Sequence, residues 1–408
     1  MTPEQIADIQ QDFPFLSREL DGQSVLYLDS AATSLKPRQM VEAVNQYYLY
    51  ESTNIHRGKH ALGEAASNRY EQARYKLADW AGCHGNEVVM VKNTTEGLNI
   101  VANGLNLTKQ DEVIVFADAH HANLLPWMEN ATVHIVPLNH LHQPDLNQYY
   151  DLLKRKPKVV ALNHCSNVTG VYLDIQPLIA AAQQTGAITV LDAAQSAPHR
   201  KLNFADWNVD FMVFSGHKML GPTGVGVLCG RRERLNELSV TTLGGGMVDW
   251  VDQQGYRLRK IPHRFEAGTP NIAGAYGMAA AIDYLEQLGQ DAIISHEKAF
   301  SQALFYAANS RDYLEIVNPD ETADRGGIIT FSIPGMDNLD DLARTLSDSY
   351  AIMCRTGHLC AQPYVNAVTS GQVIRVSGYF YNQLSDVERV FSALDEVTEE
   401  FREGVFEI

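Results

Sequence analysis

The stretch that decides the fold is KVVALNHCSNVTGVYLDIQPLIAAAQQTGAITVL, residues 158–191. It opens with the apolar, β-branched run KVVALN and closes with a second run, AITVL. Between the runs, Asp174 is a candidate N-cap for a helix that extends to Thr185, and Gly186 follows at the position where helices commonly end. A helix between two buried strands is the connection that parallel strands require. The stretch therefore predicts one βαβ unit.

Similar apolar runs recur on both sides of this unit, separated by helical stretches. Several are continuously apolar, which is typical of strands that helices cover on both faces. The runs lie at 87–91, 112–116, 133–137, 158–163, 187–191, 211–214 and 224–228. After about Gly277 the pattern changes to longer helical stretches with fewer strands. We therefore predict an α/β domain over residues 21–276, built on a large, mostly parallel mixed sheet, and a smaller α+β domain formed by residues 1–20 and 277–408.

The composition is that of a soluble globular protein with an acidic excess. The chain has 408 residues, with 32 Lys+Arg against 49 Asp+Glu, which gives a net charge of −17. Nucleic acid is not expected as a partner, because neutralising phosphates requires clustered Lys and Arg. No apolar run reaches the ~20 residues of a membrane-spanning helix. The first residues lack the basic start and apolar core of a secretory signal.

The cysteines do not form a recognisable disulfide or metal framework. They are scattered and offer no CxxC pair, which favours a reducing cytoplasm. Because their number is odd, at least one thiol has no disulfide partner and needs another role. The five are Cys83, Cys165, Cys229, Cys354 and Cys360.

Polar residues that follow the predicted strands are the first candidates for a site, because ligands bind beyond the carboxyl ends of strands in such sheets. Lys218, in the segment SGHK at 215–218, could form a Schiff base with a carbonyl cofactor, although most lysines are simply exposed. Asp192 ends a buried run and could keep a pyridine nitrogen protonated or, alternatively, cap a helix. The two residues together favour a pyridine-ring cofactor.

Such a cofactor also needs a phosphate site and a flat group against its ring. Thr94 and Thr95 precede a predicted helix at 96–104, so their hydroxyls and the free N–H groups of the helix could bind a phosphate. A simple N-cap role explains the same residues equally well. His120 could lie flat against the ring, or it could be structural.

Two other motifs do not meet the requirements of a metal site or of a phosphate-binding loop. His56 and His60 have the spacing of a zinc-binding helix, but no Glu follows His56 and Gly58 weakens a helix there, so no metal site is expected. The segment GPTGVG at 221–226 lacks the Lys-Ser/Thr of a phosphate-binding P-loop.

As a set, these residues resemble a known family. SGHK at 215–218, Asp192 with Gln195, and TTEG at 94–97 are similar to the aminotransferase class V group of pyridoxal-phosphate enzymes. Further blocks resemble the group II, SufS/CsdA-like cysteine desulfurases: YLDSAA at 27–32, HRG at 56–58, HHAN at 120–123, SNVTG at 166–170, FEAGTPN at 265–271 and RTGHLCAQP at 355–363. The blocks extend to Arg375 and so cover nearly the whole chain. The resemblance implies fold type I of the pyridoxal-phosphate enzymes and a homodimer.

The resemblance also implies residue roles for pyridoxal 5'-phosphate. Lys218 would carry the cofactor, Asp192 would pair with the pyridinium nitrogen, Gln195 would contact the phenolic oxygen and His120 would stack on the ring. The implied cofactor-binding set is Thr94, Thr95, His120, Asn167, Asp192, Gln195, Ser215, His217 and Lys218, with Thr269 from the second subunit.

The implied reaction converts L-cysteine to L-alanine, with sulfur held as a persulfide on Cys360 and passed to a SufE-like or SufU-like acceptor protein. Attack requires the thiolate, which Arg355 and His358 would favour. The implied catalytic residues are Lys218, Cys360 and His120, and the implied substrate-binding residues are Asn167, Arg355, Arg375 and His56.

The sequence departs from the family in two places and leaves alternatives open. Leu359 stands where the family often has a second histidine, and Asn93 stands where it often has glycine. A selenocysteine lyase or a cysteine C–S lyase could use the same scaffold. A non-catalytic scaffold protein is a remote alternative, which the presence of Lys218 and Asp192 disfavours. Pro363, close to Cys360, predicts a short, constrained loop.

Overall fold

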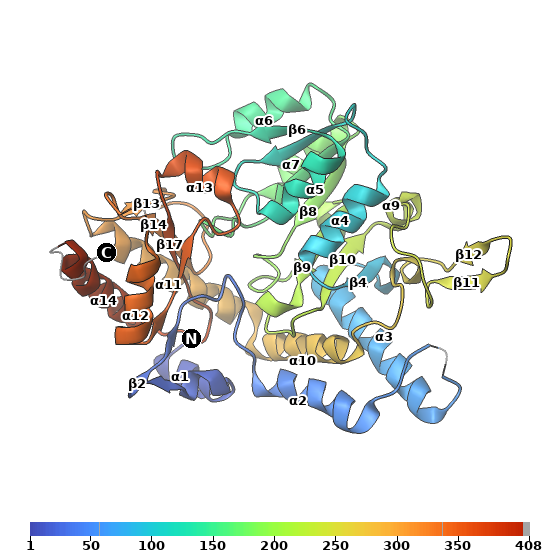
Figure 1. Ribbon diagram of the computed structural model, residues 1–408, viewed down its shortest axis with the longest axis horizontal. Coiled ribbons are helices and arrows are strands. Elements are labelled where there is room, and N and C mark those ends of the chain that lie inside the picture. The colour runs from blue at the N-terminus through green and yellow to red at the C-terminus, as the bar shows by residue number, and fades with distance from the viewer. Residues whose placement is uncertain (57, 337, 403–408) are drawn as a thin grey trace.

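A seven-stranded mixed sheet dominates the computed structural model, which describes residues 1–56, 58–336 and 338–402 (Figure 1). The strand order is β4-β10-β9-β8-β7-β5-β6. Strands β5 to β9 pair in parallel, and β10 is antiparallel to both β4 and β9. The bounds are β4 Val88–Val91, β5 Glu112–Phe116, β6 Thr132–Val136, β7 Val159–Asn163, β8 Ile188–Asp192, β9 Phe211–Ser215 and β10 Gly226–Gly230. The predicted α/β class, with its large, mostly parallel mixed sheet, is confirmed.

The stretch at 158–191 forms the predicted βαβ unit. Helix α7 (Ile175–Gln184) connects β7 to β8, and the two strands pair in parallel with Asn163 opposite Asp192. Asp174 occupies the N-cap position, but its side chain makes no capping hydrogen bond. Gly186 adopts a φ of +85°, which suits glycine because other residues are strained there.

Helices cover both faces of the sheet, as the continuous apolar runs predicted. Because side chains alternate along a strand, Val113 and Val115 face one apolar cluster while Ile114 and Phe116 face another. The first cluster includes residues of α4 (Thr94–Gly104) and α5 (Leu125–Asn130), and the second includes residues of α3 (Ala61–Ala81), α6 (Leu146–Leu153), α7 and α10 (Ile272–Leu288). The sheet is therefore buried on both sides.

A second, four-stranded sheet follows in the C-terminal part of the chain. Its order is β13-β14-β17-β16, and all its pairs are antiparallel. The strands are β13 Glu315–Ile316, β14 Ile328–Ser332, β16 Arg355–Gly357 and β17 Val373–Ser377. A separate apolar cluster packs this sheet with α11 (Gln290–Asn309), α12 (Asp340–Tyr350) and α14 (Ser385–Arg402). This is an α+β arrangement.

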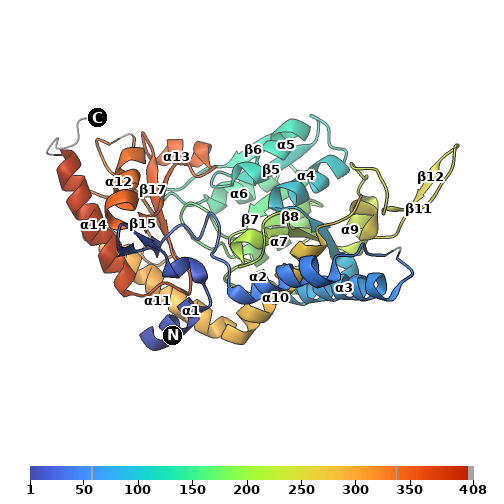
Figure 2. The same ribbon diagram turned by 60° about the horizontal axis from the view of Figure 1, so that its bottom comes forward.

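The predicted boundary near residue 277 stays a prediction. Helix α10, which spans it, packs against α2 (Arg38–Gln46) and α3. At the N-terminus, α1 (Pro3–Gln11) is tied to the C-terminal part, because Gln10 Nε2 donates to the Tyr381 carbonyl at 2.8 Å. The two views agree that α10 runs along the side of the molecule that α2 and α3 share (Figures 1 and 2).

One hairpin projects from the molecule. Strands β11 (Val248–Val251) and β12 (Tyr256–Leu258) extend away from the large sheet in both views (Figures 1 and 2). Trp250, Val251 and Tyr256 are exposed on it. Among the described residues, no helix has the length and apolar character to cross a membrane.

Candidate active site

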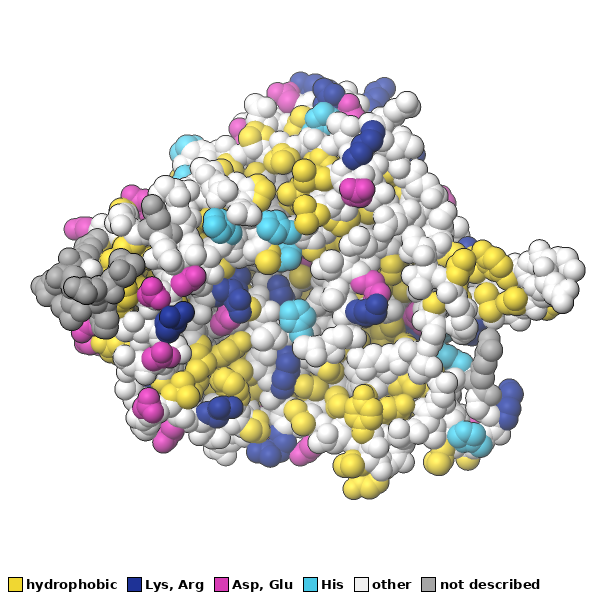
Figure 3. Space-filling view, viewed as in Figure 1, with side chains coloured by type: hydrophobic (Ala, Val, Ile, Leu, Met, Phe, Trp, Pro, Cys, Tyr) yellow, Lys and Arg dark blue, Asp and Glu magenta, His cyan; other side chains and the backbone are white. Residues whose placement is uncertain are grey.

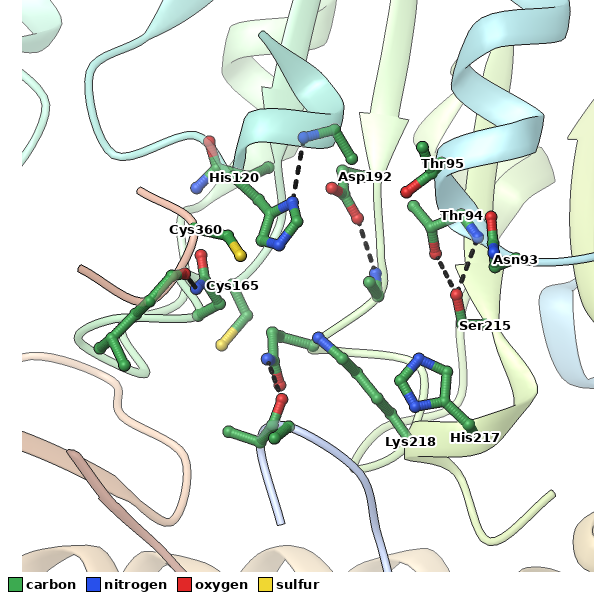
Figure 4. A pocket seen from close by; sticks show the side chains of 18 of the residues that line it. Asn93, Thr94, Thr95, His120, Cys165, Asp192, Ser215, His217, Lys218 and Cys360 are labelled. Atoms are coloured by element: carbon green, nitrogen blue, oxygen red, sulfur yellow. Dashed lines mark hydrogen bonds between the residues drawn. The ribbon is translucent and has the colours of Figure 1, made fainter. Parts of the chain in front are cut away.

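A cavity of about 500 Å³ lies where the strands of the large sheet end and the loop after β16 approaches. Histidine, lysine and arginine side chains gather around a hollow on this face of the molecule (Figure 3), and Lys218, His120, Asp192 and Cys360 lie around one space (Figure 4). The structure brings together these predicted residues on the cavity wall: Thr94, Thr95, His120, Asn167, Asp192, Gln195, Ser215, His217, Lys218, Arg355, Cys360 and Arg375.

One end of the cavity is a cradle for an anion. The Ser215 hydroxyl accepts a hydrogen bond from the Thr94 backbone N–H at 2.8 Å and lies 2.7 Å from the Thr94 hydroxyl. Helix α4 begins at Thr94, two residues earlier than predicted, because Asn93 is the N-cap and its Oδ1 accepts from the Glu96 N–H at 2.9 Å. Hydroxyls beside a helix N-terminus favour a phosphate. Asn93, a departure from the family, therefore starts this helix.

Lys218 and Asp192 face the middle of the cavity. Burial, followed by the charge of Arg375, lowers the pKa of Lys218 to about 8. A lysine of this kind can lose its proton near neutrality and act as a nucleophile or base. Asp192 ends β8, and its Oδ1 accepts from the Ala194 N–H at 2.9 Å. Burial raises the pKa of Asp192. The alternative role of Asp192 as a helix cap does not hold, because no helix begins there.

His120 presents a neutral ring to the cavity. Its Nδ1 accepts from the Ala122 N–H at 3.0 Å, which fixes the ring and leaves the proton on Nε2. Burial and the charge of Lys218 lower the pKa of His120 to about 4. The imidazole is therefore uncharged at neutral pH, as a group that packs flat against an aromatic ring should be.

Cys360 lies on a tight turn at the cavity mouth, in agreement with the predicted constrained loop. Its side chain is exposed, and helix α13 (Gln362–Val368) begins two residues later. Leu359 and Cys360 have φ values of 53° and 54°. The Leu359 carbonyl accepts from Asn167 Nδ2 at 2.8 Å, and the Leu359 side chain is buried in an apolar cluster. The cysteine therefore sits on a short anchored turn and not on a long arm.

Two arginines form a cationic region beside Cys360. Arg375 is buried, donates from Nη1 to the Asn167 carbonyl at 2.8 Å and lies 3.3 Å from Asp29 Oδ1 through Nη2. Arg355 pairs with the other oxygen of the same carboxylate at 2.7 Å. Asp29 thus holds both guanidinium groups in place. Its role was not predicted, although it lies in the quoted block at 27–32.

The cavity wall carries buried polar atoms that lack protein partners. Among the described residues these include Gln195 Oε1, Arg375 Nε, Asp118 Oδ1 and Asn163 Oδ1. A buried polar atom without a partner costs roughly 1–3 kcal/mol, so a polar ligand is expected to complete the site. The donor set fits pyridoxal phosphate: a hydroxyl-lined anion cradle, a carboxylate for a ring nitrogen, a flat neutral imidazole and a lysine for a carbonyl.

Several wall residues had no predicted role. Asp118 follows β5 and Asn163 is the last residue of β7, so both lie at the strand ends that the sequence marks as the first candidates for a site. Cys165, for which the sequence suggested no role in the site, also lines the cavity. Its Sγ donates to the Gly170 carbonyl at 3.3 Å, and burial raises the pKa of this thiol. Cys165 is therefore a neutral thiol in the same cavity as Cys360.

Three predicted residues do not line the cavity within this chain: Thr269, His56 and His358. Thr269 lines a different pocket, beside Glu266. His56 lies 3.8 Å from Glu71 Oε1, in a group with His263 whose potential metal-ligand atoms lie within 4.8 Å of one another. His56 does not line the cavity within one chain, and its assignment as a substrate contact stays a prediction. Arg57, in the middle of its block, lies outside the described residues.

Comparisons with known proteins identify the family of the chain. A model of the aminotransferase class-V family matches residues 26–390. The chain belongs to this family. It is 36% identical, over 97% of each chain, to a probable cysteine desulfurase of Staphylococcus aureus, and 38% identical, over 96% of each chain, to one of Staphylococcus epidermidis. The expected family is thus confirmed.

Solved structures show the same relationship for this aminotransferase class V member. A cysteine desulfurase from Thermococcus onnurineus aligns with a TM-score of 0.91 at 36% identity, covering 98% of both chains. The cysteine desulfurase CsdA from Escherichia coli aligns with a TM-score of 0.87 at 33% identity, covering 97% of this chain and 98% of its own. The predicted fold type I is confirmed. The cystine C–S lyase C-DES, at 21% identity and a TM-score of 0.81, shares the fold alone.

Proposed function

We propose that this protein is a pyridoxal-phosphate-dependent cysteine desulfurase that converts L-cysteine to L-alanine and holds the sulfur on Cys360. The observation that carries the proposal is one cavity lined by Lys218, Arg375 and the exposed Cys360. A lysine base, a carboxylate-binding arginine and an accessible thiol are the protein groups that this reaction needs. The names of the relatives support the same activity.

When bound, pyridoxal phosphate supplies a carbonyl for the substrate amine and an electron sink for the carbon that loses a proton. Thr94, Thr95, Ser215 and His217 would hold its phosphate, Asp192 its ring nitrogen, Gln195 its phenolic oxygen and His120 its ring face. Asn167 completes the proposed set. Each of these side chains lines the cavity.

The remaining steps belong to the residues of the chain. Arg375, assisted by Asn167 and Arg355, binds the substrate carboxylate and orients the sulfur toward Cys360. Lys218 Nζ takes the Cα proton, which its pKa of about 8 permits near neutral pH. The Cys360 thiolate then attacks the substrate sulfur. The S–S bond forms as the Cβ–S bond breaks, and the carbon skeleton takes up protons and leaves as L-alanine.

The proposal also includes a second subunit and a sulfur acceptor protein. A second copy of the chain would bring Thr269 and His56 to the cavity of its partner, as expected for a homodimer. A SufE-like or SufU-like acceptor would collect the sulfur, in a reducing compartment such as the cytoplasm. Lyase activity on selenocysteine or on a cysteine C–S bond is the alternative. A C–S lyase has no need for a persulfide-forming thiol, so the exposed Cys360 favours the desulfurase.

The test is mass spectrometry of the cofactor-loaded protein after treatment with L-cysteine. The peptide that contains Cys360 should gain one sulfur, and L-alanine should appear. Cys360→Ala should abolish both the added sulfur and reductant-dependent sulfide release, whereas the matched control Cys354→Ala should not. Sulfide release that persists in Cys360→Ala would favour the C–S lyase. Lys218→Ala should remove the visible absorption that the loaded protein shows.

A further inference from the structure

The histidine pair at 120–121 faces two different partners. His120 lines the cavity, whereas His121 contacts the turn that carries Cys360. The His121 backbone N–H donates to the Cys360 carbonyl at 2.7 Å. Its Nε2 accepts from the Gln362 N–H at 3.1 Å. His121, which follows β5, thus donates to the carbonyl before Ala361 and accepts from the N–H after it.

The Gln362 N–H needs this partner. Gln362 is the first residue of α13, so its N–H is one of those that a helix cannot satisfy internally. The N-cap residue, Ala361, has no side chain that could accept it, and no capping bond is made there. His121 is itself held by the short helix η4 (His121–Asn123), where the Leu124 N–H donates to its carbonyl at 3.2 Å. The imidazole therefore replaces a helix cap.

The turn that His121 holds is strained. Leu359 and Cys360 both have φ near +54°, in the left-handed region, which costs a non-glycine residue about 1–2 kcal/mol. Two such residues in succession persist only where the surroundings determine the backbone. Asn167 holds the carbonyl of the first and His121 the carbonyl of the second. Without these contacts the turn would relax and the thiol would move.

We propose that His121 is a positioning residue, which fixes the Cys360 thiol at the sulfur of the substrate. The inference rests on the proposed role of Cys360 as the sulfur nucleophile. The contribution of the side chain is the lone pair of Nε2, because every variant at this position keeps the backbone N–H. Loss of that lone pair leaves the Gln362 N–H to solvent, removes one of the ties at the base of the turn and lets Cys360 leave its productive position.

Two variants separate this role from a merely structural one. His121→Phe keeps a ring but removes the acceptor, whereas His121→Gln places an amide oxygen the same number of bonds from the backbone as Nε2. In the cofactor-loaded enzyme, single-turnover persulfide formation on Cys360 should slow at least tenfold in His121→Phe and recover to within threefold of wild type in His121→Gln. Cofactor absorption and the KM for L-cysteine should stay within twofold in both.

The inference is overturned if His121→Phe forms persulfide at the wild-type rate, or if His121→Gln is as slow as His121→Phe. A second measurement does not depend on turnover: the rate at which iodoacetamide alkylates Cys360, followed by peptide mass mapping without L-cysteine. This rate should change at least threefold in His121→Phe and return in His121→Gln; an unchanged rate counts against the inference. If wild type forms no persulfide at all, the proposed function fails, and alkylation still decides whether His121 positions the thiol.

Discussion

Replacing Asp118 by asparagine is expected to stabilise the protein at neutral pH but not at pH 4. The Asp118 side chain is only 5% exposed, and burial raises its pKa from 3.8 to about 6. Asp118 Oδ2 accepts from Asn163 Nδ2 at 3.2 Å, while Oδ1 has no hydrogen-bond partner. Asparagine can keep the bond to Asn163 without a buried charge.

The sign and size follow from proton linkage. Between pH 4 and 6 the folded state keeps a proton on Asp118 that the unfolded chain has lost, so the free energy of unfolding falls as the pH rises. A change from 3.8 to about 6 corresponds to about 3 kcal/mol at roughly 1.36 kcal/mol per pH unit. Asp118→Asn removes this fall in the free energy of unfolding, because asparagine does not ionise. The variant should therefore gain up to about 3 kcal/mol over wild type above pH 7.

Urea denaturation of the two proteins from pH 4 to pH 8 measures this difference directly. The stability difference should be small at pH 4, grow through pH 6 and level off above pH 7. Asp312→Asn, the same change at an exposed position, should show no such growth. A difference between Asp118→Asn and wild type that does not vary with pH, or a variant less stable than wild type at pH 7, would refute the reasoning.

Three further changes test the packing and charges around the site. Leu359→Ala should lower the free energy of unfolding by about 2–5 kcal/mol, because it empties part of a buried cluster; a loss below ~1 kcal/mol by denaturation would contradict this. Glu266→Gln should lower the free energy of unfolding by up to about 3–5 kcal/mol, because the buried Arg74 guanidinium would keep only Glu71 as a carboxylate partner; a loss below ~1 kcal/mol by denaturation would contradict this. Burial alone would raise the pKa of Glu266, but Arg74 holds this pKa well below its usual range. The pair therefore stabilises the folded wild-type protein at neutral pH. This stabilisation is lost as the pH falls through the pKa of Glu266 in the folded state. Arg375→Lys should raise the KM for L-cysteine at least tenfold, since lysine cannot reproduce the planar guanidinium fork; an unchanged KM would remove Arg375 from the carboxylate site.

The strands were predictable because burial on both faces leaves continuous apolar runs. Each predicted run overlaps its observed strand, with ends that differ by at most two residues. The start of α4 was less predictable, because Asn93, Thr94 and Thr95 are all good N-cap residues and the backbone alone decides among them. Sequence reasoning therefore found this helix but placed its start two residues late, and the phosphate site at its N-terminus stays a prediction.

The role of His121 was beyond sequence reasoning. Its Nε2 meets an N–H that lies 241 residues further along the chain, so no local pattern marks it. For Thr269 and His56 the reverse holds: the sequence suggested a role in the site, but the structure of one chain shows no such contact. The resemblance assigned them to the site, Thr269 from a second subunit, but within one chain neither of them lines the cavity. Long-range contacts and contacts between subunits are what the local pattern does not contain.

The choice of nucleophile illustrates how environment, more than residue type, determines chemistry here. Two thiols line one cavity. Cys165 is buried, its hydrogen engages the Gly170 carbonyl and burial raises its pKa, so it stays protonated and a poor nucleophile. Cys360 is exposed and shares the cavity wall with Arg355 and Arg375. The same fold that keeps one cysteine buried and protonated therefore leaves the other accessible, and in the proposed reaction the turn held by Asn167 and His121 would set the direction from which Cys360 attacks.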